Sequence, residues 1–113
     1  MIEEEISLID EIYHIVSNGN VLPFDSLEYV YRINRKEGWS SIGVVYLLNG
    51  EIISQNDFTN IDEEALELTC EKLHRKMLEN TGGDWQKFVL NFSDNRIKTN
   101  FSYEEQSLIE ELP

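Results

Sequence analysis

Asp84-Trp85-Gln86-Lys87-Phe88-Val89-Leu90-Asn91-Phe92 leads through Ser93-Asp94-Asn95 into Arg96-Ile97-Lys98-Thr99-Asn100-Phe101-Ser102-Tyr103-Glu104-Glu105, and this stretch decides the fold. Apolar residues recur at every second position of both arms, which is the period of a β-strand. The short polar residues between the arms tolerate positive φ and bond back to the chain, as a tight turn requires. The stretch therefore predicts an aromatic β-hairpin. One face carries Thr99 and six residues that we assign to the core: Phe88, Leu90, Phe92, Ile97, Phe101 and Tyr103.

The segment before this hairpin predicts an amphipathic helix. It begins within residues 60–63, where either Asn60 with Glu63 as a capping box or Asp62 as a simple N-cap would start it. Gly82-Gly83 ends it, because glycine adopts the left-handed backbone of a helix C-terminus at little cost. The predicted buried stripe consists of Ala65, Leu66, Thr69, Cys70, Leu73 and Met77.

Upstream of this helix, residues 27–54 predict three strands. Residues 27–33 alternate, with Leu27, Tyr29, Tyr31 and Ile33 on the buried face. Residues 40–48 are apolar on both faces, which predicts a central strand. Asn49-Gly50 favours a type I′ turn, because both of its residues tolerate positive φ, and residues 51–54 begin the third strand.

The N-terminal segment predicts a second amphipathic helix. Its apolar stripe has the spacing of a helix face and consists of Ile2, Ile6, Ile9, Tyr13 and Val16, widened by Ile12. Carboxylates crowd the first turns, where the helix dipole favours negative charge, and residues 17–20 supply the Asn and Gly that end helices. Because no Lys or Arg precedes Arg32, we expect an acidic exposed face.

The predicted order of elements is α-β-β-β-α-β-β, within a single domain that spans residues 1–113. Three consecutive strands do not alternate with helices as in a parallel α/β fold, so the predicted class is α+β. We expect a five-stranded antiparallel sheet with two helices packed on one face. Residues 104–113 form an acidic C-terminal segment for which three outcomes stay open: an extended last strand, a short helix around Leu108, Ile109 and Leu112, or a frayed end.

The composition restricts the classes of partner. Twenty-two acidic and nine basic residues give a formal net charge of −13, which repels nucleic-acid phosphates and anionic membranes and favours a basic partner. Solubility is the ordinary alternative explanation for such a charge. The single cysteine excludes an intrachain disulfide, and the sequence shows neither a signal peptide nor an apolar run long enough to span a membrane. We therefore expect a cytoplasmic protein.

Catalytic and metal-binding patterns are weak. Glu71 and His74 form only half of a carboxylate-histidine metal site, and an ordinary solvated helix face explains them better. Cys70 has His74 one turn away, but it lies on the apolar stripe, where cysteine is commonly a small core residue. No phosphate-binding, dinucleotide or hydrolase motif occurs. We therefore predict a protein that is not an enzyme and uses no cofactor or metal, although a hydrolase with an unrecognised carboxylate pair stays open.

Two tryptophans, Trp39 and Trp85, stand where strands are predicted to begin. Tryptophan is enriched at interaction hot spots because it offers a large rigid surface and an N–H donor. Packing in the core or at a sheet edge is the commoner role of such a residue. Asn91, Lys98, Asn100 and Ser102 make the outer face of the hairpin polar, which suits either plain solvation or recognition.

The order of elements over residues 40–105 resembles that of the YezG-like immunity proteins, the antitoxins of bacterial polymorphic-toxin and contact-dependent inhibition systems. The sharper matches are Trp85, which opens the penultimate strand, and the closing residues Phe101, Tyr103 and Glu104. The turn departs from the family pattern, since Asp94-Asn95-Arg96-Ile97 stands where members often have a Gly-Lys-Phe-like step.

The resemblance implies a small non-catalytic protein that neutralises a cognate toxin domain, expected to be a basic nuclease, by tight binding in the cytoplasm as a monomer or a homodimer. An acidic adaptor that binds a basic host protein without inhibiting an enzyme is the alternative function. An acidic surface could occupy or approach a nuclease groove that normally binds phosphates. The candidate toxin-binding residues are Glu3, Glu4, Asp10, Glu11, Trp39, Glu63, Glu64 and Glu67.

Overall fold

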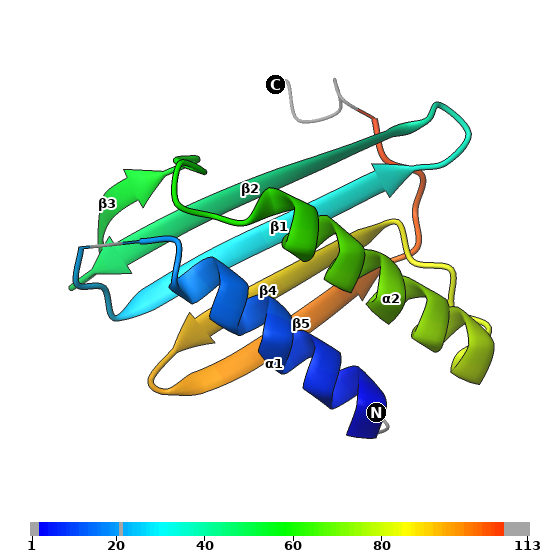
Figure 1. Cartoon of the computed structure of the whole chain (residues 1–113), viewed down its shortest axis with the longest axis horizontal. Helices are drawn as coiled ribbons and strands as arrows, with labels where there is room; N and C mark the ends of the chain where they lie inside the picture. The colour runs from blue at the N-terminus through cyan, green and yellow to red at the C-terminus, as the bar shows by residue number, and fades with distance from the viewer. Residues whose placement is uncertain (1–2, 21, 108–113) are drawn as a thin grey trace.

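The computed structural model describes residues 3–20 and 22–107, which form two helices and five strands (Figure 1). The order is the predicted α-β-β-β-α-β-β. The elements are α1 (Glu3–Ser17), β1 (Ser26–Asn34), β2 (Trp39–Leu48), β3 (Glu51–Gln55), α2 (Glu63–Thr81), β4 (Lys87–Ser93) and β5 (Arg96–Ser102).

The five strands form one antiparallel sheet in the order β3-β2-β1-β4-β5. The middle strand is β1, and β2 has a hydrogen-bonded neighbour on each side, so it is an interior strand as its two apolar faces predicted. The chain crosses from the β3 edge to β4 through α2, so that β4 pairs with the free side of β1 (Figure 1). Val45 and Leu47, on the second apolar face of β2, are only half-buried.

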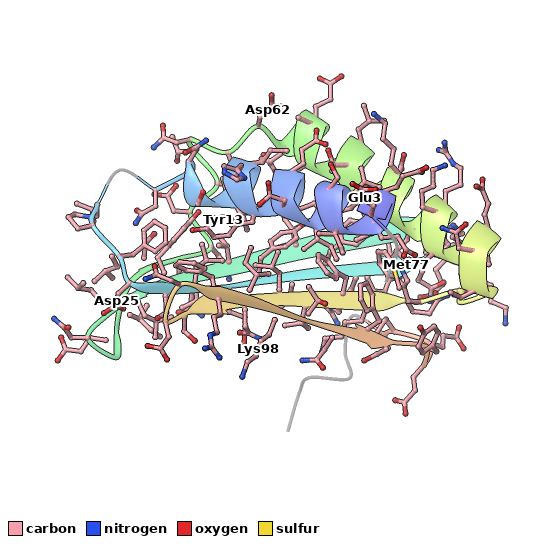
Figure 2. All side chains as sticks on the ribbon, turned by 90° about the horizontal axis from the view of Figure 1, so that it is seen from below. Glu3, Tyr13, Asp25, Asp62, Met77 and Lys98 are labelled. Carbon is pink, nitrogen blue, oxygen red and sulfur yellow. The ribbon has the colours of Figure 1, made fainter. Side chains whose placement is uncertain are left out.

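Both helices lie over the same face of the sheet, and Lys98 points away from them on the opposite side (Figure 2). The core lies between these two layers. Its largest fully buried side chains are Trp85, Tyr29, Tyr31, Tyr46, Phe88, Ile12, Leu27, Leu66, Leu73, Leu90, Val16 and Val44. The predicted inner faces of β1 and of the C-terminal hairpin supply five of the buried residues of this core and four partly buried residues that pack against it.

Two tight turns adopt the predicted backbone. Asn49 and Gly50 have φ values of 53° and 81°, and Asp94 and Asn95 have values of 51° and 59°. Positive φ at both central positions is the property of a type I′ turn, whose twist matches that of the strands it joins. The polar dipeptides therefore favour both hairpin turns locally, and at the first turn the Asn49 N–H also donates to Asp25 Oδ2 at 3.0 Å.

In α1 the buried face matches the predicted stripe at Ile9, Ile12 and Val16 but includes Glu5 in place of Ile6. The buried residues are Glu5, Ile9, Ile12 and Val16, whereas Ile6 is 55% exposed. Ile2 lies outside the described residues. The buried residues are four, three and four positions apart, as predicted for a helix face. Periodicity alone does not decide between two adjacent faces of the helix when both carry isoleucine. Contact with α2 and the sheet decides it.

Asp62 is the N-cap of α2, and its side chain accepts a hydrogen bond from the backbone N–H of Ala65 at 3.1 Å. The simple cap is therefore used rather than the capping box. At the other end, Gly82 has a φ of 74° and its N–H bonds to the Leu78 carbonyl. The buried stripe matches the prediction at Leu66, Thr69, Cys70, Leu73 and Met77, with His74 added.

Strand β5 ends at Ser102, and the chain then leaves the sheet. Tyr103 is 57% exposed, so its assignment to the core was wrong. Residues 103–107 cross to the end of β1 without extending the strand, and Asn34 Nδ2 donates to the Gln106 carbonyl at 3.0 Å. The helix considered around Leu108, Ile109 and Leu112 lies outside the described residues. The strand alternation stops at Tyr103 because its arm no longer pairs with β4.

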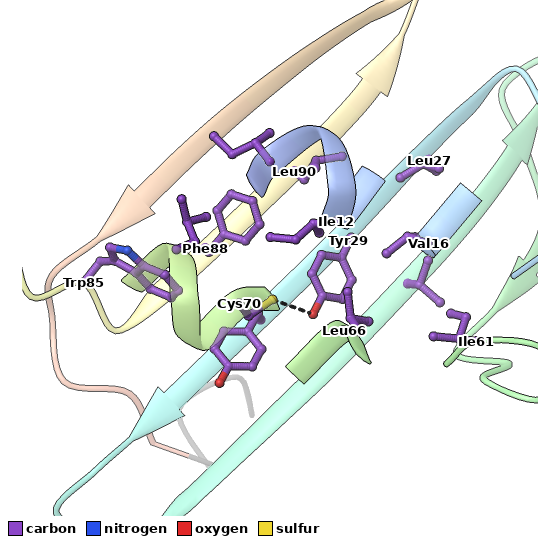
Figure 3. Close-up of a cluster of buried hydrophobic side chains, with 14 of the residues drawn as sticks. Ile12, Val16, Leu27, Tyr29, Ile61, Leu66, Cys70, Trp85, Phe88 and Leu90 are labelled. Atoms are coloured by element: carbon purple, nitrogen blue, oxygen red, sulfur yellow. Dashed lines mark hydrogen bonds between the residues drawn. The ribbon is translucent and has the colours of Figure 1, made fainter. Parts of the chain in front are cut away.

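Three tyrosine hydroxyls join the sheet to the helices. Tyr29 Oη lies 3.5 Å from Cys70 Sγ on α2 (Figure 3), and Tyr31 Oη donates to Glu67 Oε1 at 3.0 Å. Tyr46 Oη donates to the Val16 carbonyl at the end of α1, which also accepts from the backbone N–H of Gly19 at 3.0 Å. Burial raises the pKa of Tyr46 to about 12, so its hydroxyl stays protonated and able to donate at neutral pH.

Truncation of Phe88 should test the core assignment. Phe88→Ala removes a fully buried ring that stacks on Phe101, so we expect a loss of about 3–5 kcal/mol in the free energy of unfolding. Tyr103→Ala is the matched control on the same hairpin, and because Tyr103 is exposed its cost should stay within about 0.5 kcal/mol. Urea unfolding followed by fluorescence measures both values. Equal losses for the two variants would contradict the observed end of the core.

Candidate functional site

The predicted toxin-binding residues come from three elements, namely α1, α2 and β2. Glu3 and Glu4 are exposed on the first turn of α1, and Asp10 and Glu11 are exposed further along the same helix. On α2, Glu63 and Glu64 are exposed whereas Glu67 is half-buried. Trp39 is half-buried at the start of β2. The eight residues therefore do not form a single patch.

The first turn of α1 lies against basic residues of α2. Lys76 Nζ is 2.9 Å from Glu4 Oε2. This hydrogen bond and the charge of Glu4 raise the pKa of Lys76. A groove of about 420 Å³ follows the two helices here. Its lining consists of Glu4, Ser7, Leu8, Lys72, Arg75 and Lys76. The negative charge predicted at Glu4 is therefore offset locally, which removes Glu4 from a purely acidic surface.

The other end of the helix layer keeps its negative charge. The helices pack along each other, and Thr69 Oγ1 lies 3.5 Å from Glu11 Oε1, so the later turns of α1 adjoin the first turns of α2. Residues 10–17 and 62–71 contain no Lys or Arg. We call their seven carboxylates the acidic end: Asp10, Glu11, Asp62, Glu63, Glu64, Glu67 and Glu71. Four of the predicted contacts, besides Glu67, belong to it.

Glu67 and Trp39 meet around a surface hollow of about 450 Å³ between α2 and the end of the sheet. No local pattern in the sequence pairs these two residues, which are 28 positions apart along the chain. The hollow is lined by Ile33, Asn34, Arg35, Gly38, Trp39, Ser40 and Glu67. Glu63 and Glu67 also share a smaller neighbouring hollow of about 140 Å³ with Ser40. Two predicted contacts from separate elements are thus brought to one place.

The Glu67 carboxylate is held by two hydroxyls. Tyr31 Oη donates to Oε1 at 3.0 Å, and Ser40 Oγ donates to the same oxygen at 3.2 Å. Burial, followed by the nearby Glu67 charge, raises the pKa of Tyr31 well above its usual range, so the phenol remains a donor. The carboxylate is consequently oriented from below, by the sheet, rather than left to rotate in solvent.

Trp39 is positioned through the β1–β2 turn. Its Nε1 donates to Glu37 Oε1 at 2.8 Å, and Asn34 Nδ2 donates to that same oxygen at 3.1 Å. Asn34 is itself buried at the end of β1. The guanidinium of Arg32 lies over the Trp39 ring, 5.6 Å from its centroid, in a cation–π arrangement. These contacts hold the indole near Glu67.

Beside this hollow lies a cluster that sequence reasoning missed. His74 is 5% exposed, and its Nε2 is 2.8 Å from Asp84 Oδ1. Arg35 Nη2 is 3.1 Å from His74 Nδ1, and the His74 ring packs edge-on against Trp85 at a centroid distance of 5.0 Å. The assignment of His74 to a solvated face was wrong. His74 is four positions after Cys70, a spacing that places both residues on the buried face of the helix. The Lys and Arg residues next to His74 in the sequence favoured an exposed position instead.

Two groups of opposite charge contact the His74 imidazole. Asp84 Oδ1 lies 2.8 Å from Nε2, and the Arg35 guanidinium lies 3.1 Å from both Nε2 and Nδ1. A proton added to the ring would bring a second positive charge next to this guanidinium. Burial, opposed by the Asp84 hydrogen bond and assisted by the Arg35 charge, lowers the pKa of His74 below its ordinary value. The cluster is thus built around an uncharged imidazole.

The remaining reactive groups are enclosed. Cys70 is fully buried, and burial raises the pKa of its thiol to about 12, so it stays protonated at neutral pH.

Among residues 3–20 and 22–107, no group of three or more His, Cys, Asp or Glu side chains could hold a metal ion. None of the helices in these ranges is both long and apolar enough to cross a bilayer.

The fold and the site together define an α+β domain in which a group of carboxylates on the helices lies next to an oriented Glu67–Trp39 pair. Neither the protein-family models nor the curated proteins contain a match to this chain.

The His74 cluster should make stability depend on pH. The pKa of His74 in the folded state lies below the unfolded value of about 6.5. The contribution of neutral His74 to the free energy of unfolding is therefore complete above pH 6.5 and is lost as the pH falls below it. Relative to His74→Gln, the wild type should lose up to about 1.4 kcal/mol for each pH unit below 6.5, until the folded-state pKa is reached. Urea unfolding at pH 7.5, 6.5 and 5.5 measures this, with His14→Gln as the control at an exposed histidine. Identical pH profiles for wild type and His74→Gln would refute the assignment.

Proposed function

We propose that this protein is an immunity protein that binds and neutralises a cognate bacterial toxin domain, a basic nuclease, in the cytoplasm. Neutralisation rests on tight protein–protein binding and involves no catalysis by this chain. The binding surface consists of the acidic end together with the Glu67–Trp39 hollow.

The observation that carries this proposal is the separation of charge within the helix layer. Lys72, Arg75 and Lys76 gather at the groove beside Glu4, whereas the acidic end has seven carboxylates in two spans that contain no Lys or Arg. Ordinary solubility requires only a net charge and does not require one sign to be concentrated in this way. A concentrated patch is what steers encounter with a basic surface and sets its orientation.

A nuclease groove is a suitable counterpart for such a patch. Proteins that bind nucleic acid present Lys and Arg to the phosphates, and binding to these cations is strongly salt-dependent. The acidic end can pair with the same cations or with the margin of the groove. The oriented Trp39 adds a rigid aromatic surface of the kind that concentrates binding energy at protein interfaces.

The sequence resemblance supports the same proposal. Trp85 packs against Phe88 and Phe101 at centroid distances of 5.9 and 5.7 Å, so two residues that carry the resemblance meet in the core. They serve the fold, and the acidic surface lies on the helices above. The alternative function, an adaptor, would use the same surface. An immunity protein inhibits the enzyme that it binds, whereas an adaptor leaves its partner active.

Co-expression with the toxin domain encoded next to this chain should protect cells and yield a stable complex. The triple variant Asp10→Asn, Glu11→Gln, Glu64→Gln should slow association about tenfold at low salt, because it removes three charges from the acidic end. Glu28→Gln, Glu51→Gln, Asp94→Asn is the matched control, since it changes the net charge equally at sites outside the helix layer. Stopped-flow association over a salt series measures the difference.

The proposal fails if no complex with a neighbouring toxin domain forms at micromolar concentration. Equal slowing by the two triple variants would show that net charge, and not the acidic end, drives the encounter. A complex that leaves the partner enzyme fully active would favour the adaptor function. Turnover of a substrate by the purified chain, abolished by one carboxylate substitution, would favour the hydrolase.

A further inference from the structure

We infer that the hollow between Trp39 and Glu67 is a binding subsite for the guanidinium group of one arginine side chain presented by the partner. The identity of that partner as a toxin domain rests on the proposed function. The subsite itself rests on the geometry of the hollow and can be tested without a toxin.

The first support is the state of the Glu67 carboxylate. Both hydroxyl donors, from Tyr31 and Ser40, go to Oε1. Within the described part of the chain, Oε2 of this side chain receives no hydrogen bond, while the residue as a whole lines the hollow. A half-buried carboxylate with one oxygen anchored and the other available is oriented for a cation, and a charged donor is its strongest hydrogen-bonding partner.

The second support is the indole of Trp39, which is independent of the carboxylate. The Nε1 bond to Glu37 holds the ring at the wall of the hollow. Arg32 already lies over this ring and is not among the residues that line the hollow, so the indole is a surface on which a guanidinium rests in this protein. An aromatic face next to a carboxylate matches a planar guanidinium, which can stack and donate in its plane at once.

The charges around the hollow also favour a cation. Glu37 and Glu67 both contribute carboxylates near Trp39. Arg35 is the cation in the lining, but its guanidinium contacts His74 and lies 3.6 Å from Asp84 Oδ1, which offsets its charge. A lysine ammonium would gain the charge attraction but would lose the planar stacking, so arginine is the preferred occupant.

The test is a titration of the ¹⁵N-labelled protein with butylguanidinium, followed through the two indole N–H signals, which Trp39→Phe assigns. We expect a saturable shift of the Trp39 signal at millimolar concentration. The Trp85 signal is an internal control, because Trp85 is fully buried and should not respond. Butylurea has the same shape without the charge and should produce no saturable shift, and butylammonium should bind more weakly than butylguanidinium.

Glu67→Gln is the decisive variant, because its amide oxygen can still accept from Tyr31 and Ser40 while the charge is lost. It should weaken butylguanidinium binding roughly five- to tenfold. Glu79→Gln changes the same charge on the same helix, outside both the hollow and the acidic end, and should bind like the wild type. An equal response of Glu67→Gln and the wild type, or a shift caused equally by butylurea, would overturn the subsite.

The toxin experiment gives a separate outcome. If the complex forms and Glu67→Gln leaves its dissociation rate unchanged, the proposed function stands and the subsite is overturned as a partner contact. If butylguanidinium binds as expected and no toxin complex forms, the subsite stands and the proposed function fails. A roughly tenfold faster dissociation of the Glu67→Gln complex, with Glu64→Gln acting only on association, would support both.

Discussion

The architecture depends on the need of three buried tyrosine hydroxyls to find partners. Tyr29, Tyr31 and Tyr46 stand on the inner face of the sheet, and each side chain is almost fully removed from water. A hydroxyl buried without a hydrogen bond costs free energy, so each must reach a polar atom in the layer above. The partners are a thiol and a carboxylate on α2 and the last turn of α1. Apolar packing attracts the helices to the sheet, and these three bonds specify where they lie.

One of the three bonds also connects the core to the candidate site. The Tyr31 hydroxyl that needs a partner orients Glu67, and the Ser40 hydroxyl adds a second bond to the same oxygen. On the other wall of the hollow, the buried Asn34 holds Glu37, which in turn holds the indole of Trp39. The acidic and aromatic groups are therefore positioned by residues whose own positions the sheet determines. Such support gives the surface pair a rigidity that exposed side chains on a helix lack.

The fold was predictable because its signals are local. Alternation in residues 27–33 and 84–102 placed the inner faces of three neighbouring strands, and two polar dipeptides placed the hairpin turns. The errors arose where a choice depended on neighbours. Periodicity suited a stripe through Ile6 as well as the observed one through Glu5, and only packing against α2 and the sheet selects between them. Tyr103 continued the alternation of its strand in sequence, although pairing had already ended at Ser102.

By itself, the sequence determined the α+β class, the order of elements, the turns, most core positions and the excess of negative charge, because each follows from residues close together along the chain. The tertiary structure alone decided that Glu67 meets Tyr31 and Trp39, that His74 lies between Asp84 and Arg35, and that Lys76 offsets Glu4. These partners come from different elements. Their meeting depends on the order of the strands and the placement of the helices over the sheet, which no local pattern specifies.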